Sequence, residues 1–460
     1  MQNTKFASLK LPQSLLKNLD DLGYREMTPI QAKSLPYALG GRDVIAKAKT
    51  GSGKTASFGI PMLTQLNVKS FKVQGLVLCP TRELADQVAK ELRRLARFTH
   101  NTKILTLCGG VGFGPQLGSL EHGAHIVVGT PGRIQEHLRK GSLSLKHLQM
   151  LVLDEADRML DMGFYDRITE IINLTPKKRQ TLLFSATYPD TIEQLSASIQ
   201  RQPVSVSVEA VHKSSDIEQC FFHVEKSARA EALIKLLATY RPESTVAFCN
   251  TKKQCAELAA ELREQGISAL ALHGDLEQRD RDQVLVRFAN RSCSVLVATD
   301  VAARGLDISD LQAVVNVELS RDPEVYVHRI GRTGRAGKSG FAWSLYTERE
   351  LYKLDAIAEY QGNPIEEGNL ADMKAPNDFE LRPPMVTLEI AGGRKQKVRP
   401  GDILGALTGD AGIPGQQVGK IDIYDFSAFV AVKRAVANQA LKRLEKGKIK
   451  GRNFKVRKLR

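Results

Sequence analysis

The 460-residue chain contains no run of eighteen or more apolar residues, the length that a membrane-spanning helix needs. Its first ten residues also lack the apolar core of a secretory signal peptide. We therefore expect a cytoplasmic protein with no part in a membrane. The six cysteines form no C-x-x-C pair and have no matching histidine spacing, which favours buried thiols over metal ligands or disulfides.

Acidic residues are scarce in one region, the C-terminal segment from Arg382 to Arg460. This segment contains 18 Lys and Arg residues against 6 Asp and Glu, so it carries +12 of the net charge of +15. A solvated tail is the simplest alternative, but the segment also contains apolar strand and helix patterns. The concentration of positive charge indicates a polyanionic partner.

Short apolar runs rich in β-branched residues alternate with amphipathic helix patterns twice along the chain. The runs are at residues 75–79, 125–129, 151–153 and 181–184, and then at 245–249, 269–272, 294–298 and 313–317. Fully apolar strands that alternate with helices predict parallel sheets covered on both faces. A chain of this length also favours more than one domain.

These patterns predict an α/β fold with two parallel-sheet domains in tandem, in residues 1–208 and 213–365. Ligands of such domains bind at the carboxyl ends of the strands. A polar stretch at residues 366–383 predicts a linker. Residues 384–460 alternate strand and helix patterns that suit a small α+β module with an antiparallel sheet.

The segment Ala48–Thr55 reads AKTGSGKT and follows a strand-like run. Its glycines let backbone N–H groups turn towards phosphates, Lys54 can reach the β and γ phosphates, and the Thr55 hydroxyl can bind Mg²⁺. The strict phosphate-loop pattern has glycine in place of Ala48, so a glycine-rich surface loop is the alternative. The predicted nucleotide-binding residues here are Thr50, Gly51, Ser52, Gly53, Lys54 and Thr55.

A second motif, the acidic sequence DEAD, covers Asp154 to Asp157 and directly follows the apolar run LVL. Asp154 would hold Mg²⁺ and Glu155 would orient or activate the attacking water, as phosphoryl transfer requires. Carboxylates that merely favour the start of a helix are the alternative. The phosphate loop upstream makes the catalytic interpretation the stronger one.

These two motifs belong to a larger set, and over about residues 6–365 the chain resembles the DEAD-box RNA helicases. The other motifs are GYREMTPIQ (Gly23–Gln31), PTRELA (Pro80–Ala85), TPGR (Thr130–Arg133), SAT (Ser185–Thr187), HGDLEQRDR (His273–Arg281), ATDVAARGLD (Ala298–Asp307) and HRIGRTGR (His328–Arg335). The family also has alanine at the position of Ala48. The resemblance implies two RecA-like domains that together hydrolyse ATP when RNA is bound.

The resemblance implies further residues of the ATP site in the first domain. Arg25, Thr28 and Gln31 would contact the nucleotide, with Gln31 reading adenine because an amide can donate and accept together. Phe6 would support the adenine, and a packing contact to the first helix is its alternative.

In the second domain, the resemblance makes Asp307 a ribose ligand. Arg332 and Arg335 would be arginine fingers, since planar guanidinium groups suit an oxygen-rich transition state. Ser185 and Thr187 of the first domain resemble a relay between the nucleotide and RNA sites. A cap at the end of a strand is the alternative for that pair.

The same resemblance implies contacts to the RNA backbone, which do not read base sequence. The residues concerned are Arg82, Gly110, Thr130 and Arg133 in the first domain, and Gln278, Arg281 and Thr299 in the second. The motor alone is therefore expected to select RNA without selecting a sequence.

Residues from about 384 onward resemble a degenerate RRM, the RNA recognition motif, and this tail resembles that of one bacterial group of the family. That resemblance implies a 23S ribosomal RNA hairpin, in the hairpin 92 region, as target and a role in large-subunit assembly. An RRM usually has two aromatics on its third strand, but Ser427 replaces one here and Phe429 remains. Packing and base stacking are both open for Phe429, and Lys448 and Lys450 are the predicted phosphate contacts.

The chain is therefore expected to be an ATP- and Mg²⁺-dependent RNA helicase that locally unwinds or remodels RNA as a monomer. An ATP-gated RNA clamp is one alternative, and it would bind a duplex without releasing a strand. A DNA helicase is another, and DNA would then stimulate its ATPase as well as RNA does.

Overall fold

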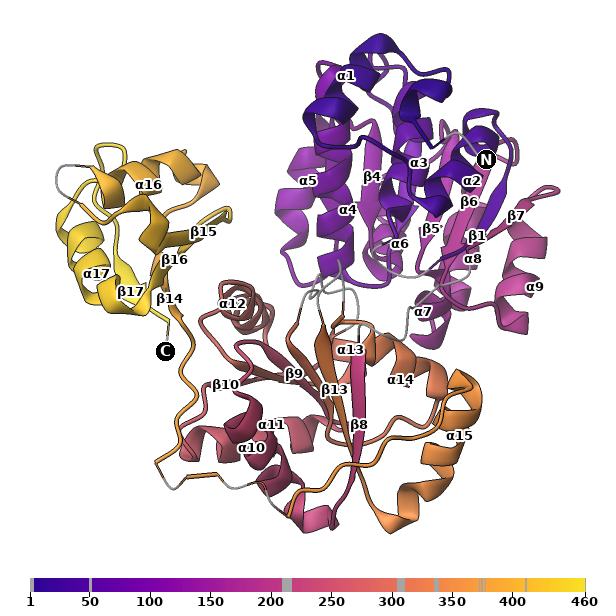
Figure 1. Cartoon of the computed structure of the whole chain (residues 1–460). Coiled ribbons are helices and arrows are strands. Elements are labelled where there is room, and N and C mark those ends of the chain that lie inside the picture. The colour runs from indigo at the N-terminus through magenta and orange to yellow at the C-terminus, as the bar shows by residue number, and fades with distance from the viewer. Residues whose placement is uncertain are drawn as a thin grey trace. The chain divides into compact units, whose positions relative to one another are not determined.

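The structure is a computed structural model that describes residues 4–48, 52–208, 217–303, 311–334, 339–371, 373, 375–376, 378–409 and 412–459. The described residues up to 208 form one compact unit, and those from 217 onward form a second (Figure 1). None of the described helices is long and apolar enough to cross a membrane.

The first unit contains a parallel sheet of seven strands in the order β3-β4-β2-β5-β6-β1-β7. Its strands are β1 Val44–Lys47, β2 Gly75–Leu78, β3 Ile104–Leu107, β4 Ile126–Gly129, β5 Met150–Asp154, β6 Gln180–Ser185 and β7 Val204–Ser207. Its helices are α1 Gln13–Asp21, α2 Pro29–Leu39, α3 Lys54–Thr64, α4 Arg82–Leu95, α5 Phe113–Glu121, α6 Pro131–Arg139, α7 Ala156–Asp161, α8 Tyr165–Asn173 and α9 Asp190–Ile199.

Helices cover both faces of this first sheet because its strands are apolar on both faces. Val77 of β2 belongs to the core cluster shared with α1 to α4, whereas Leu76 and Leu78 belong to the cluster shared with α6 to α9. All three side chains are 0% exposed. The predicted doubly covered parallel sheet is confirmed.

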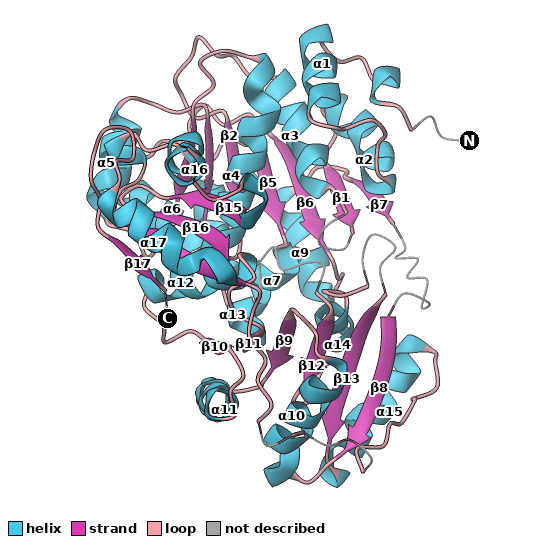
Figure 2. Ribbon diagram, turned by 60° about the vertical axis from the view of Figure 1, so that its left-hand side comes forward, coloured by secondary structure: helices cyan, strands magenta, loops and turns pink. Residues whose placement is uncertain are grey.

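The second unit contains a parallel sheet of six strands in the order β10-β11-β9-β12-β13-β8. Its strands are β8 Ile217–His223, β9 Thr245–Phe248, β10 Ala269–Leu272, β11 Val295–Ala298, β12 Ala313–Asn316 and β13 Gly340–Tyr346. The helices around it are α10 Arg229–Tyr240, α11 Lys252–Glu264, α12 Gln278–Ala289, α13 Asp300–Ala303, α14 Pro323–Ile330 and α15 Leu351–Gln361 (Figure 2).

The C-terminal module has a four-stranded antiparallel sheet in the order β15-β16-β14-β17. Its elements are β14 Met385–Ile390, α16 Pro400–Thr408, β15 Val418–Ile423, β16 Ala428–Lys433, α17 Ala437–Lys446 and β17 Val456–Lys458. One face of the sheet packs with both helices around Leu388, Ile403 and Leu444. The predicted fold class is therefore confirmed, while the exact domain boundaries stay a prediction.

Candidate ATP and RNA sites

The predicted ATP residues of the first unit follow three neighbouring strands at one edge of the sheet. The phosphate loop follows β1, the acidic motif begins at the end of β5, and the SAT motif begins at the end of β6. These strands are adjacent in the sheet order β5-β6-β1. Because parallel strands end at the same edge, their loops form one candidate nucleotide site.

The phosphate loop leads into α3 through Gly53, which has a left-handed φ of 90°. A Cβ atom at Gly53 would lie 2.5 Å from the Gln31 amide nitrogen, so a side chain here would displace the Gln31 amide in addition to straining the backbone. The Lys54 Nζ is buried and donates a 3.2 Å hydrogen bond to the Ala48 carbonyl oxygen. Thr50 and Gly51 lie outside the described residues.

Gln31 and Thr28 hold the phosphate loop from α2. The Thr28 hydroxyl donates to the Ser52 carbonyl at 2.8 Å, and the Gln31 Nε2 donates to the Gly53 carbonyl at 3.0 Å. The Gln31 Oε1 accepts from the Thr28 backbone N–H at 2.9 Å. Both ends of the Gln31 amide are thus engaged within the protein, and its adenine role stays a prediction.

The two other residues predicted near adenine differ in burial. Phe6 is 3% exposed and packs edge-on against Tyr24, with ring centroids 6.1 Å apart, in the core cluster that includes Leu15. The packing contact, the alternative to adenine support, is thus present. Arg25 is exposed. Adenine contacts by Phe6 and Arg25 stay predictions.

Asp154 has the environment of a cation ligand. It is 3% exposed, and its Oδ1 has no hydrogen-bond partner among the residues that the structure describes. Burial raises the pKa of the Asp154 carboxyl to about 6, against the attraction of Lys54, while the neighbouring Glu155 adds to the rise. A buried carboxylate oxygen without a partner fits a Mg²⁺ ligand.

Glu155 occupies a strained position between β5 and α7. Its φ of 54° is left-handed, which is rare for a residue with a long side chain. Its carboxylate is 3% exposed and lies 3.3 Å from the guanidinium of Arg158. The turn places Glu155 directly beside the candidate Mg²⁺ ligand, as a residue that orients water requires.

Asp157 joins the acidic motif to the SAT motif, a role that the sequence analysis missed. Its Oδ2 accepts from the backbone N–H groups of Ala186 and Thr187 at 3.2 and 3.1 Å and from the Thr187 hydroxyl at 3.2 Å. The Ser185 hydroxyl in turn donates to the Thr187 carbonyl at 2.7 Å. Ser185 and Thr187 are therefore connected to the nucleotide edge, while the relay itself stays a prediction.

In the second unit, all three guanidinium nitrogens of Arg329 donate hydrogen bonds within the protein. The sequence analysis did not predict a role for this residue. It is 2% exposed and pairs with both Asp300 carboxylate oxygens at 2.7 Å. It also donates to Asn250 Oδ1 at 3.2 Å, Asn316 Oδ1 at 3.1 Å and the Glu318 carbonyl at 2.8 Å. These partners follow or end β11, β9 and β12, which are adjacent in the sheet.

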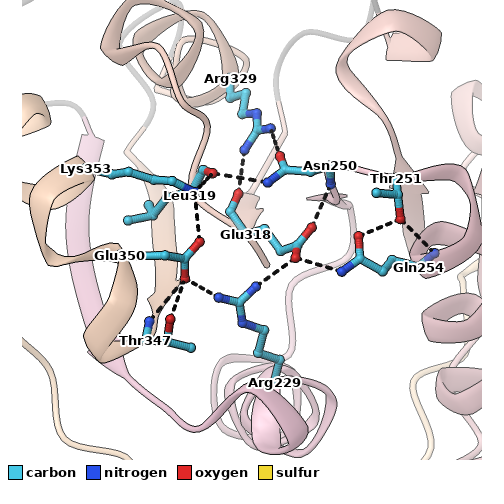
Figure 3. A network of polar contacts seen from close by, with 10 residues as sticks. All are labelled: Arg229, Asn250, Thr251, Gln254, Glu318, Leu319, Arg329, Thr347, Glu350 and Lys353. Atoms are coloured by element: carbon cyan, nitrogen blue, oxygen red, sulfur yellow. Dashed lines mark hydrogen bonds and ion pairs between the residues drawn. The ribbon is translucent and has the colours of Figure 1, made fainter.

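Further ion pairs lie around Glu318, whose carbonyl accepts a hydrogen bond from Arg329 (Figure 3). Arg229 lies 3.1 Å from Glu318 and also pairs with Glu350, while Lys353 lies 3.0 Å from Glu350. Figure 3 shows Glu318 in contact with Arg229 of α10, Gln254 of α11 and Arg329 of α14, while Lys353 of α15 contacts Glu350 and the Leu319 carbonyl. These contacts fix the end of α14, immediately before the predicted finger Arg332, against the strand ends.

Arg332 is 9% exposed and follows α14, and its finger role stays a prediction. The other predicted finger, Arg335, and the predicted ribose ligand, Asp307, lie outside the described residues.

The predicted RNA residues of the first unit follow the other half of the same sheet edge. Arg82 begins α4 after β2, Gly110 follows β3 with a φ of 75°, and Thr130 and Arg133 follow β4. These strands are adjacent in the order β3-β4-β2, next to the nucleotide half. One edge thus presents two neighbouring candidate sites.

The predicted RNA residues of the second unit follow β10 and β11, which are also neighbours. Gln278 begins α12 and donates to Asp282 at 2.8 Å. Arg281 donates to the Ala302 carbonyl at 2.8 Å, and the Thr299 hydroxyl accepts from the Ala302 N–H at 3.4 Å. These residues lie together, and their contact with RNA stays a prediction.

The C-terminal module contains a basic groove of about 730 Å³ between α16 and the end of α17. Its lining residues are Asp402, Gly405, Ala406, Gly409, Lys442, Arg443, Lys446, Gly447, Lys448 and Lys450. The two predicted phosphate contacts, Lys448 and Lys450, are thus brought together with three further basic side chains and one acidic one.

Phe429, in contrast, is 3% exposed and packs edge-on against Tyr424 at 5.4 Å. Its ring is therefore part of the protein interior in this structure. The packing alternative is thus present, and base stacking by Phe429 stays untested.

Three segments of the chain match known protein families. Residues 28–195 match the DEAD/DEAH box helicase family, residues 228–337 match the helicase conserved C-terminal domain, and residues 387–458 match the DbpA RNA binding domain. Among solved structures, S. cerevisiae Dbp5 bound to RNA and ADP BeF3 is 31% identical, with a TM-score of 0.73. That match covers 80% of this chain and 97% of the Dbp5 chain.

Curated relatives extend the similarity over the whole length. The ATP-dependent RNA helicase DbpA of Escherichia coli (strain K12) is 53% identical over 464 residues, covering 99% of this chain and 100% of that protein. The DEAD-box ATP-dependent RNA helicase CshA of Geobacillus kaustophilus (strain HTA426) is 45% identical over 355 residues, 77% of this chain and 76% of that protein. The chain therefore belongs to the DEAD-box ATP-dependent RNA helicases, as a member of the DbpA type with an RNA-binding C-terminal domain.

Proposed function

We propose that this helicase is directed by its C-terminal module to the hairpin 92 region of 23S ribosomal RNA, where it remodels RNA during assembly of the large ribosomal subunit. The basic groove of the module is the observation that carries the proposal. We further propose that the protein works as a monomer in the cytoplasm, with ATP and Mg²⁺.

In the proposed mechanism, the first unit holds the triphosphate and orients the attacking water. Lys54 and the backbone of the phosphate loop would bind the β and γ phosphates, and Glu155 would orient the water. Asp154 and Thr55 would hold Mg²⁺, partly through water, and its charge would offset that of the phosphate oxygens. Arg332 of the second unit would complete the site when ATP and RNA are both bound.

The motor would hold RNA through groups that every RNA strand shares. Gly110 offers a backbone N–H in a left-handed turn, and Arg133 and Arg281 offer guanidinium groups. Such contacts accept phosphate and 2′-hydroxyl oxygens irrespective of the bases. Target selection must therefore come from another part of the chain.

The groove supplies a surface suited to a folded RNA. Lys442, Lys446 and Lys448 stand with two further basic residues around it, and Asp402 is the acidic residue of the lining. The groove is also built into the fold, because Arg443 donates to the Ala406 carbonyl at 2.8 Å and so joins α17 to α16. Closely spaced phosphates of a hairpin match this arrangement of charge.

Removal of residues 384–460 is expected to leave an RNA-stimulated ATPase that no longer distinguishes the hairpin from other RNA. The shared backbone contacts remain in this variant, while the charged groove is lost. ATPase rates measured against hairpin RNA and against a scrambled RNA of equal length test this. A truncated motor that keeps its full preference for the hairpin would contradict the proposal.

Paired substitution of Lys448 and Lys450 by alanine sharpens that test within the intact chain. Each phosphate contact releases condensed counterions. Loss of two contacts should therefore make the negative slope of log affinity against log salt shallower by about 2. Phe429→Leu is the matched control, since it retains a buried apolar side chain and should leave the hairpin affinity and slope unchanged. A larger loss of hairpin affinity in Phe429→Leu than in the lysine variant would indicate recognition by the sheet instead.

A further inference from the structure

A buried histidine connects two segments that bind RNA in the proposed function. His137 belongs to α6 and is 0% exposed, and neither the proposed chemistry nor the proposed RNA contacts use it. Helix α6 follows β4, while the loop at residues 108–112, which contains Gly110, follows the neighbouring strand β3. The two strands pair in register with Leu107 opposite Gly129, so the loop and the helix leave the sheet side by side.

A hydrogen-bonded relay runs from α6 to this loop. The His137 Nε2 lies 3.1 Å from the Gln116 Oε1, and the Gln116 Nε2 donates to the Cys108 carbonyl at 2.8 Å. On the other side of the ring, His137 Nδ1 lies 2.8 Å from the Ser142 hydroxyl. Gln116 is 7% exposed, so the relay is shielded from competing water.

Aromatic and cationic contacts reinforce the same junction. The His137 ring stacks on Phe113, with centroids 4.2 Å apart and planes at 18°. Lys140 Nζ lies over the Phe113 ring at 4.0 Å, and the Arg133 guanidinium lies 5.8 Å from it. Arg133 also donates to the Val111 carbonyl at 3.0 Å, so it joins the two segments directly.

The relay requires a proton on the His137 Nε2. Because the Gln116 amide nitrogen donates to Cys108, its oxygen must accept from His137 Nε2–H. On the Nδ1 side, the Ser142 hydroxyl also lies within donating distance of the His137 backbone carbonyl, at 3.1 Å. Burial lowers the pKa of His137, and the nearby Arg133 lowers it further, which favours a neutral ring.

We propose that His137 is a positioning residue for RNA binding: through Gln116 and Phe113 it fixes the 108–112 loop against α6. Gly110 and Arg133 then meet an RNA strand as one preformed surface. Preorganisation raises affinity because less conformational freedom is lost when RNA binds. This inference rests on the proposed RNA contacts of Gly110 and Arg133, and it adds how those contacts are held in place.

RNA-stimulated ATPase of the full-length chain tests the relay, with single-stranded poly(U) as the RNA. His137→Phe retains the stack and Gln116→Leu retains the volume, but each breaks the relay. Each is expected to raise the RNA concentration for half-maximal stimulation about tenfold, with kcat at saturating RNA and KM for ATP unchanged. The double variant should be no weaker than either single one, because both changes break one relay.

His125 provides a matched control in the same unit. It is also 0% exposed, accepts from the Lys103 N–H at 2.9 Å, lies 3.0 Å from the Val68 carbonyl and contacts the Phe71 ring at 4.7 Å. However, it precedes β4, at the opposite end of the strand from α6. His125→Phe is therefore expected to lower Tm as His137→Phe does, without changing the RNA requirement, that is, the RNA concentration for half-maximal stimulation.

Arg133→Ala separates this inference from the proposed RNA site. If Arg133→Ala raises the RNA requirement while His137→Phe and Gln116→Leu stay within about twofold of wild type, positioning by His137 is overturned and the RNA site stands. An equal effect of His125→Phe would also overturn it, since general destabilisation would then explain the result. If Arg133→Ala has no effect, the proposed RNA site itself fails.

Discussion

Lys54→Ala is expected to reduce RNA-stimulated ATP hydrolysis by about 10³-fold or more. Lys54 begins α3 directly after the left-handed Gly53 and lies near Asp154, whose carboxyl pKa it pulls down. Without this cation, charge on the β and γ phosphate oxygens lacks its partner in the transition state. Steady-state phosphate release at saturating RNA and Mg²⁺·ATP measures the effect.

Lys47→Ala is the matched control for this loss. Lys47 is the exposed last residue of β1, directly before the phosphate-loop motif that begins at Ala48. Its removal should leave the rate nearly unchanged, and hairpin binding through the C-terminal module should survive in both variants. Substantial hydrolysis by Lys54→Ala would remove the phosphate-loop assignment.

Arg332→Ala is expected to lower kcat by about 10³-fold if this residue is an arginine finger, with much less change in nucleotide affinity. The buried Arg329 network holds the preceding helix to three strand ends, so the loss would come from the missing guanidinium and not from a displaced helix. Arg332→Lys keeps the charge without the planar fork and should recover little of the rate. Single-turnover hydrolysis and nucleotide titration together separate the two quantities.

A different pattern would reassign this arginine. If nucleotide affinity fell in Arg332→Ala while kcat did not, the side chain would bind phosphate in the ground state. The prediction that Arg332 acts in the transition state would then be wrong.

The fold and the edge that carries the sites could be predicted because both depend on local sequence patterns. Apolar runs such as residues 75–79 are buried on both faces, which leaves a plain signal, and the motif loops follow such runs directly. Strand β15 gave a weaker signal, because its pairing with β16 shifts between Val418 and Ile421 and its polar residues interrupt the alternation. The module's fold class was nevertheless predictable from its other strands and helices.

The contacts that hold the sites could not be predicted from local patterns. Arg329 meets Asn250, Asp300 and Glu318 only because β9, β11 and β12 are neighbours, and strand order is not written in any one motif. The relay from His137 to Cys108 likewise depends on the pairing of β3 with β4. Residue type alone marks a histidine or glutamine as a candidate for many roles, and its partner decides among them.

The most direct test of the central claim is ATP-dependent release of a short strand from an RNA duplex joined to the 23S ribosomal RNA hairpin. The account predicts that the full chain releases the strand with ATP, at least about tenfold faster at low protein concentration than from the same duplex without the hairpin. A variant lacking residues 384–460 should release the short strand from the two substrates, with and without the hairpin, at the same slow rate. Stable ATP-dependent binding to the tagged duplex without strand release would contradict the account and indicate an RNA clamp.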